Sequence, residues 1–276
     1  MTEQYYLFKG CLIPTRLPYL EASSKYVLDR LGVDILDLPG ATCCVEPIGL
    51  RTLASDTWLV TVARMLAVAE KEGRDVLTLC NGCYLSFLEA VHELKVVEKR
   101  DAVNGVLSKI GLEYKAGARV RHILEKVHSL GEDKLRSMVS CEQSGLKIAP
   151  HTGCHFLRPS GIGLPEDPIA PAMLADIASW SGAEVVNKEF WPECCGGGVS
   201  SVDEGLSSRM LERVAGIYRA KGANCILTPC PFCFSQFDLR QKGGLPVLYI
   251  TELIAMAMAA PAERLGLRYH RVKVMQ

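Results

Sequence analysis

The cysteines of this chain form two matching sets, and their spacing constrains the fold more than any other feature of the sequence. Each set has a single cysteine, then an adjacent pair, then a C-x2-C motif. The first set is Cys11, Cys43, Cys44, Cys80 and Cys83, and the second set is Cys154, Cys194, Cys195, Cys230 and Cys233. Of the 12 cysteines, only Cys141 and Cys225 lie outside these sets. Independently placed cysteines would very rarely repeat in this way, so the chain is predicted to consist of two related halves.

Short apolar runs precede the cysteine groups in both halves. These runs span residues 5–11, 33–44, 75–80, 147–154, 183–195 and 224–230. Segments with apolar residues at helical spacing follow, at 20–31, 59–69, 173–180 and 206–218. This alternation predicts an α/β fold with two pseudo-symmetric Rossmann-like halves, each containing a small parallel sheet. The apolar stripes themselves indicate core packing. The order of elements puts each cysteine group at the carboxyl end of a strand, where open α/β sheets bind their ligands.

The segment that joins the halves is more charged and follows a helical pattern. Its apolar residues at helical spacing are Val120, Ile123, Leu124 and Val127. We therefore expect a first cysteine-rich domain at 1–95, a helical connector at 96–145 and a second cysteine-rich domain at 146–276. The connector has two open interpretations: an amphipathic helix that only packs on the body of the protein, or one that docks a partner.

Charge balance and apolar segments exclude several classes of protein. Lys plus Arg and Asp plus Glu number 31 each, so no basic excess favours general nucleic-acid binding. The first residues lack a basic patch followed by an apolar run, which argues against a signal peptide. The most apolar segments, 58–69 and 253–260, are shorter than the roughly 20 residues of a membrane-spanning helix. We therefore expect a cytoplasmic protein with reduced thiols, in which clustered cysteines are typical of metal or redox sites.

The number of cysteines in each set favours one kind of metal site over the others. A structural zinc site uses four ligands, and so does an ordinary cubane iron–sulfur cluster. The usual bacterial ferredoxin run of cysteines is also absent. Disulfides would leave one unpaired cysteine in each set. Five thiolates per set therefore favour an iron–sulfur cluster with an unusual ligand count, with zinc and thiol or disulfide chemistry as the alternatives.

Three motifs connect this pattern with a known family. They are CNGC at 80–83, GCHFLRP at 153–159 and CCGGG at 194–198. With the chain length and the tandem arrangement, they resemble the CCG cysteine-rich domains of the B subunits of CoB–CoM heterodisulfide reductases from methanogenic archaea. The resemblance covers the chain from Tyr5 to about Ala260. It implies that each set binds one noncubane [4Fe–4S] cluster, so that all ten cysteines are cofactor and metal ligands.

The same resemblance implies an activity and partners. The expected enzyme is an oxidoreductase, the catalytic subunit that reduces CoM-S-S-CoB to the thiols coenzyme M and coenzyme B in the last step of methanogenesis. Electrons are expected from the ferredoxin-like C subunit and the electron-bifurcating flavin-containing A subunit of a heterodisulfide reductase, supplied by a hydrogenase or a formate dehydrogenase. This chain has no nucleotide fingerprint or evident flavin motif, so neither NAD nor flavin is expected in it. The alternatives are a related CCG protein serving another thiol, disulfide or lactate-linked redox complex, and a zinc-stapled interaction module.

Basic side chains near the single cysteines are the candidates for other roles at the site. His155 and Arg158 follow Cys154 and are expected to bind anionic groups of the substrate. His155 is also a candidate proton donor to a departing thiolate. Further candidates are Lys9, Arg16 and His151. The alternative for all of them is an ordinary surface charge.

The two halves also differ in ways that predict unequal surroundings for the two sites. Gly196–Gly198 follows the second cysteine pair, whereas Val45, Glu46 and Pro47 follow the first. Glycine lets the backbone approach a bulky ligand closely, so the two clusters are expected to play unequal roles. Of the cysteines outside the sets, Cys225 is expected to be a buried core residue and Cys141 an unrelated thiol.

Overall fold

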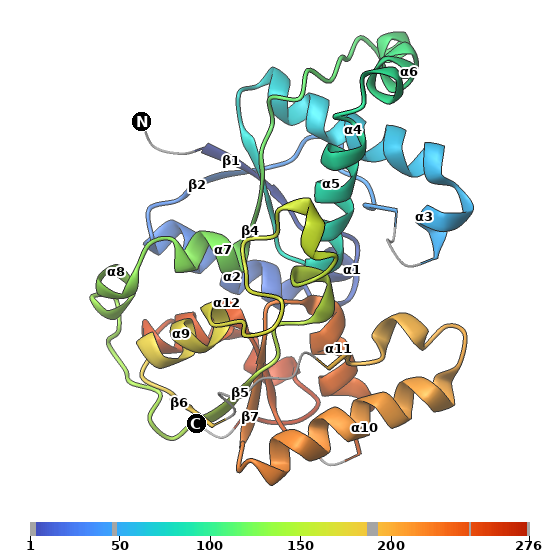
Figure 1. Ribbon diagram of the computed structural model, residues 1–276. Helices are drawn as coiled ribbons and strands as arrows, with labels where there is room; N and C mark the ends of the chain where they lie inside the picture. The colour runs from blue at the N-terminus through green and yellow to red at the C-terminus, as the bar shows by residue number, and fades with distance from the viewer. Residues whose placement is uncertain (1–3, 46–48, 187–192, 243, 275–276) are drawn as a thin grey trace.

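Two parallel sheets of four strands each form the framework of the computed structural model, which describes residues 4–45, 49–186, 193–242 and 244–274 (Figure 1). The strand orders are β2-β1-β3-β4 in the first sheet and β6-β5-β7-β8 in the second, so each central strand has the same neighbours in both halves. The strands are β1 (Gln4–Phe8), β2 (Asp34–Asp37), β3 (Asp75–Thr78), β4 (Val120–His122), β5 (Lys147–Pro150), β6 (Glu184–Val185), β7 (Cys225–Thr228) and β8 (Val247–Tyr249). The predicted α/β fold with two pseudo-symmetric halves is confirmed.

Helices follow the strands as the alternation predicts. In the first half they are α1 (Leu12–Arg16), α2 (Pro18–Arg30), α3 (Leu50–Leu53), α4 (Ser55–Lys71) and α5 (Asn81–Glu93). In the second half they are η2 (Cys154–Phe156), η3 (Ser160–Ile162), α9 (Met173–Trp180), η4 (Gly197–Val199), α10 (Glu204–Ala220), α11 (Pro231–Arg240), α12 (Ile250–Ala257), α13 (Ala262–Leu265) and η5 (Leu267–Tyr269). No helix in the described ranges combines the length and the apolar character needed to cross a membrane.

The segment at 96–145 contains a strand as well as helices. Its helices are α6 (Val97–Leu107), η1 (Ser108–Ile110), α7 (Ile123–His128) and α8 (Glu132–Arg136). Sequence spacing predicts a helix through Val120, but β4 ends at His122 and the helix begins only at Ile123. The open edge of β3 explains the difference, because its backbone groups need partners and β4 pairs with it in parallel. The Asp75 carboxylate also accepts hydrogen bonds from the backbone and side chain of Arg119, which fixes the entry to β4.

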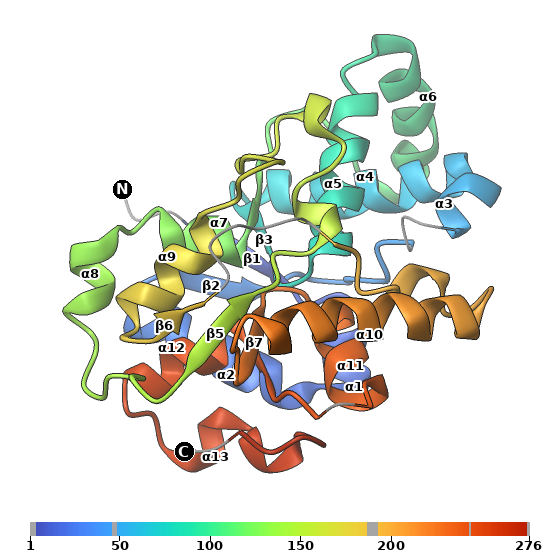
Figure 2. The same ribbon diagram turned by 60° about the horizontal axis from the view of Figure 1, so that its bottom comes forward.

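Helices and hydroxyl groups join the two halves. Helix α2 of the first half lies beside α12 of the second half in both views (Figures 1 and 2). Between them, the Ser23 and Thr251 hydroxyls are 2.8 Å apart in a buried contact. Nearer the carboxyl ends of the strands, the Tyr249 hydroxyl donates to the Leu79 carbonyl at 2.6 Å. The apolar core is continuous across this interface, so the cysteine-bearing edges of the two sheets are held close together.

Candidate metal centre

One cavity of about 320 Å³ brings both cysteine sets together. All ten cysteines line it, from Cys11, Cys43, Cys44, Cys80 and Cys83 of the first set to Cys154, Cys194, Cys195, Cys230 and Cys233 of the second. Each sheet contributes the residues that follow the carboxyl ends of three of its strands. The two sheet edges that bear the cysteines therefore face each other across the interface between the halves.

The C-x2-C motifs lie at the beginning of a helix in each half. Cys80 precedes α5 and Cys230 precedes α11, both with extended backbone, while Cys83 and Cys233 lie in the first helical turn. Pro231 at the first position of α11 favours this start, because the proline ring is compatible with the first turn of a helix. A helix N-terminus has free backbone N–H groups and a positive dipole, and both stabilise thiolates.

Side chains at equivalent positions form hydrogen bonds to the adjacent cysteine pairs in the two halves. Three residues after the last cysteine of the first set, the Ser86 hydroxyl donates to the Cys44 carbonyl at 2.7 Å. Three residues after the last cysteine of the second set, Gln236 Nε2 donates to the Cys195 carbonyl at 3.2 Å. The same backbone position is therefore anchored by different side chains, which preserves the pair geometry while its surroundings vary.

Glycine precedes each single cysteine for a steric reason. Gly10 has φ of +70°, and a Cβ atom there would lie 2.8 Å from the Cys83 sulfur. Gly153 has φ of +83°, and a Cβ atom there would lie 2.6 Å from Asn81 Nδ2. That amide donates to the Thr152 carbonyl at 2.7 Å across the interface between the halves. Both glycines are therefore needed for close packing around the cavity.

The glycines after the second pair are required by neighbouring protein atoms. A Cβ atom on Gly196 would lie 2.7 Å from the Ser207 carbonyl oxygen, and one on Gly197 would lie 2.6 Å from the Phe232 ring. Gly198 is the member of this run that lines the cavity. In the first half, Val45 has φ of 54°, and residues 46–48 lie outside the described ranges. Gly196 and Gly197 are therefore explained by protein packing. Of the three glycines, Gly198 is the one to which the expected close approach of a bulky ligand applies.

The thiols of each set share protons, because their sulfurs are too close for all of them to carry charge. The hydrogen bond from Cys154 lowers the pKa of Cys194 to about 2, and Cys194 in turn raises the pKa of both Cys154 and Cys195. In the first set, the hydrogen bond with Cys43, together with burial, raises the pKa of Cys44 to about 12. Several thiolates in one place require a compensating positive charge.

The two sets meet at the C-x2-C motifs. The Cys80 and Cys230 thiols are hydrogen-bonded to each other, although they belong to different sheets. This bond raises the pKa of the Cys80 thiol. Both residues precede their helices, so the helix starts point toward the same region between the halves. Groups bound by the two sets would therefore be neighbours.

The donor set fits iron–sulfur clusters. Each set offers five soft sulfur atoms, which are the ligands that such clusters use. The two sets share one cavity with room between them, and the helix starts and shared protons suit thiolates that bind a positively charged group. The ten cysteines that the sequence predicts as ligands are therefore in one place. Their assignment to individual clusters stays a prediction.

The predicted basic residues occupy very different environments. His155 lines the cavity, whereas Arg158 and Arg16 are exposed and are not among its lining residues. Lys9 lines the cavity, but its ammonium group is 3.0 Å from carboxylate oxygens of both Glu21 and Asp37. Burial lowers the pKa of Lys9, but these two carboxylates outweigh it and raise the pKa overall. The Lys9 charge is therefore already balanced by the protein.

His151 is not a surface cation. Its side chain is fully buried, and burial lowers the pKa of the imidazole to about 4. The interpretation of His151 as a surface charge near Cys154 is therefore wrong, because His151 directly follows β5 and its ring packs against Phe237 and Tyr218. Of the two cysteines outside the sets, Cys225 is buried in β7 as expected, and Cys141 is exposed.

Sequence reasoning did not single out two other residues of the cavity. Asn81 and Phe232 both line it, each inside a C-x2-C motif. Asn81 is buried and its Oδ1 atom has no hydrogen-bond partner among the described residues, whereas the Phe232 side chain is 42% exposed. Their positions between the cysteines of a C-x2-C motif were the available signal, because the residues inside such a motif would lie beside whatever it binds.

Fold and site together define a tandem cysteine-rich α/β protein with two thiolate sets at one cavity. A family model, the CCG cysteine-rich domain, matches residues 5–88 and again residues 148–238. The two matches cover most of both halves and include the cysteines of both sets. The chain therefore belongs to the CCG cysteine-rich family of iron–sulfur redox proteins that includes the B subunits of the heterodisulfide reductases.

Individual relatives extend this finding. The chain is 38% identical to the B subunit of a ferredoxin/F420H2-dependent CoB–CoM heterodisulfide reductase from Methanosarcina acetivorans, over 97% of this chain and 93% of that protein. It is 30% identical to the membrane anchor subunit of an 8-methylmenaquinol:fumarate reductase from Wolinella succinogenes, over 98% of this chain and 97% of that protein. A crystal structure of a hypothetical protein from Helicobacter pylori has a TM-score of 0.75 at 18% identity. All of this chain is covered in that comparison, which spans 53% of the Helicobacter protein, and the likeness concerns the fold alone.

Proposed function

We propose that this chain is the disulfide-reducing subunit of a heterodisulfide reductase complex, with CoM-S-S-CoB as its substrate. The observation that carries the proposal is the single cavity lined by both cysteine sets, in which Cys80 and Cys230 meet. In this proposal, the first set and the second set each hold one noncubane [4Fe–4S] cluster. The relatives named as B subunits of heterodisulfide reductases support the substrate class.

The chemistry gives a reason for two sets at one cavity. Cleavage of a disulfide consumes two electrons and two protons and yields two thiols. Iron–sulfur clusters, when bound, pass electrons one at a time. A one-electron cleavage in solution would leave a reactive sulfur radical. A disulfide held between the two sets would have one set beside each of its sulfur atoms, so that both products could be captured as the bond breaks.

Residues of the chain supply the remaining requirements of this reaction. His155 lines the cavity next to Cys154 and is the proposed proton donor to a departing thiolate. The partly exposed ring of Phe232 lies at the same cavity and offers an apolar surface to the alkyl parts of the substrate. Lys9 is held by two carboxylates, so it contributes little net attraction for an anion. Arg158 is exposed and off the cavity, so its proposed role is limited to the outer part of a long anionic substrate.

Electrons must come from another protein, because this chain has no nucleotide-binding fingerprint of its own. The proposed donors are a ferredoxin-like C subunit and a bifurcating flavin-containing A subunit, fed by a hydrogenase or a formate dehydrogenase. The printed names of the relatives as parts of larger reductases support such an assembly.

A second candidate function follows from the Wolinella relative. That protein is named as an anchor subunit of a quinol-linked fumarate reductase, and it matches this chain over nearly its whole length. In this alternative, the chain would carry electrons between a quinol and a separate catalytic subunit, without reducing a disulfide itself. Both functions use the same cysteine sets, so the two are distinguished by substrate and not by iron content.

The test is anaerobic purification followed by iron analysis and turnover. Two clusters of four iron atoms predict about eight iron atoms per chain. With a reduced viologen as electron donor, the protein is expected to reduce CoM-S-S-CoB much faster than cystine or oxidised glutathione. Cys141→Ser is the matched control, because it removes an exposed thiol outside both sets. Full iron content with no disulfide reduction, but electron exchange with a quinol, would support the second candidate function.

A further inference from the structure

One pair of equivalent positions beside the cysteine sets differs sharply in chemistry. Phe8 and His151 each lie three residues before the single cysteine of their half. The Phe8 ring meets Phe87 edge-on with centroids 4.9 Å apart, and the His151 ring meets Phe237 edge-on at 4.8 Å. The packing is thus the same in both halves, while an apolar ring in the first half is replaced by an imidazole in the second.

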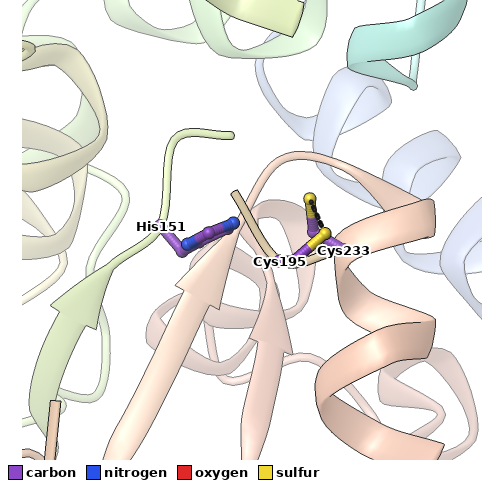
Figure 3. A group of neighbouring side chains, drawn as sticks. All are labelled: His151, Cys195 and Cys233. Carbon is purple, nitrogen blue, oxygen red and sulfur yellow. Dashed lines mark hydrogen bonds between the residues drawn. The ribbon is translucent and has the colours of Figure 1, made fainter. Parts of the chain in front are cut away.

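The two imidazole nitrogens of His151 have different surroundings. Nδ1 lies 2.9 Å from the Tyr218 hydroxyl, and Nε2 has no hydrogen-bond partner within the described part of the chain. A ring nitrogen of His151 and the sulfur atoms of Cys195 and Cys233 lie within 4.8 Å of one another (Figure 3). Figure 3 shows the ring aimed at these two sulfurs, which are 3.3 Å apart. A fully buried polar atom thus faces the second set.

The Tyr218 hydroxyl determines which nitrogen carries the proton. Its side chain is almost fully buried, so the phenol keeps its hydrogen and needs an acceptor. Donation to Nδ1 satisfies that hydrogen and leaves Nε2 as an N–H group directed at the sulfurs. The opposite arrangement would put the Nε2 lone pair against sulfurs that are negative when they bind iron. The first arrangement is therefore favoured.

We infer that, with a cluster bound at the second set, His151 Nε2–H would donate a hydrogen bond to sulfur there, and that this gives the two clusters different reduction potentials. The inference rests on the proposed function, in which each set holds one cluster. A hydrogen bond to sulfur stabilises the reduced, more negative state and raises the potential. Phe8 offers no such donor to the first set. The second cluster is therefore the better electron acceptor, and His151 is a positioning residue that gives electron flow a direction within the cavity.

The test places the residue of the first half, phenylalanine, at the equivalent position of the second half. His151→Phe introduces the side chain that already packs at the equivalent position, so the fold is expected to tolerate it. A redox titration of the iron-loaded protein, followed by electron paramagnetic resonance, is expected to show the higher-potential transition moving down while the other stays in place. His151→Gln retains an N–H donor and is expected to restore part of the difference. Tyr218→Phe removes the hydroxyl that fixes the His151 tautomer, and it is expected to give a reduction potential between those of the wild type and His151→Phe.

Iron content keeps the possible outcomes distinct. If His151→Phe has the iron content of the wild type and both transitions are unchanged, the hydrogen bond to sulfur is refuted while the proposed function stands. If the variant loses iron from the second set, His151 is a ligand and the inference is also wrong. If the wild-type protein itself binds no iron, the proposed function fails first.

Discussion

Replacing Gly153 with alanine tests how closely the cavity is packed across the two halves. The glycine has φ of +83° and ψ of 150°, a region that almost only glycine adopts and that costs an alanine about 1–3 kcal/mol. Reduced freedom of the unfolded chain offsets about 0.4–1 kcal/mol of this cost. The new Cβ atom would also lie 2.6 Å from Asn81 Nδ2 and would push it from the Thr152 carbonyl. Loss of that buried hydrogen bond adds about 1–3 kcal/mol, for a total of about 1–6 kcal/mol.

Gly131 provides a matched control for the backbone contribution. It has φ of +84° and ψ of 163°, and a Cβ atom there would meet no other atom within 4 Å, so Gly131→Ala is expected to cost only the conformational part, about 0–3 kcal/mol. Urea unfolding of the anaerobic protein, followed by circular dichroism, measures both variants. In an Asn81→Ala background the obstructing amide is gone, so Gly153→Ala should cost about the same as Gly131→Ala. Equal costs for both alanines in the wild-type background would refute the steric explanation.

Two further predictions concern the cysteine sets and a buried ion pair. Cys44→Ser and Cys195→Ser should each lose about four iron atoms, because a hydroxyl binds iron less well than a thiolate, and each should abolish most disulfide reduction. Near-normal turnover in Cys44→Ser without its iron would assign the chemistry to the second set alone. The buried pair is Glu252 and His270, 2.8 Å apart. Burial raises the pKa of Glu252; burial lowers the pKa of His270, but the hydrogen bond to Glu252 outweighs this and raises it overall. Raised pKa values stabilise the folded state at low pH, so stability should fall as the pH rises past 6.5, the ordinary value for histidine. Melting temperatures from about pH 6 to 9 should show this slope in the wild type and not in Glu252→Gln.

The repeat in the sequence was sufficient to predict three strands of each sheet and the edge of the sheets at which the cysteines lie. That inference works because an apolar run and the cysteine that ends it are local features of the sequence. The outer strands β4 and β8 were missed. Val120 and the residues after it have the spacing of a helix, and only the open edge of β3 makes them a strand; β8 is a short run that no cysteine group follows. Pairing with a distant edge leaves no local trace in the sequence.

Features that depend on packing between the halves were beyond sequence reasoning. The contact between Cys80 and Cys230 arises only when the two sheets face each other. The burial of His151 arises within the second half, where Tyr218 and Phe237 pack against its ring, and a histidine before a Gly-Cys turn is compatible with surface and core alike. Arg158 was chosen for its charge near Cys154, but a turn of the chain after η2 leaves its side chain exposed and off the cavity.

The pseudo-symmetry of the two halves has an evolutionary consequence. A symmetric homodimer of single halves would present identical residues on both sides of its cavity, because one gene would specify both. Fusion into one chain removes that constraint, and the equivalent positions here have diverged: Asn81 corresponds to Pro231, His122 to Tyr249 and Phe8 to His151. Each half can then specialise without altering the other, which is what the proposed difference in reduction potential between the two clusters requires.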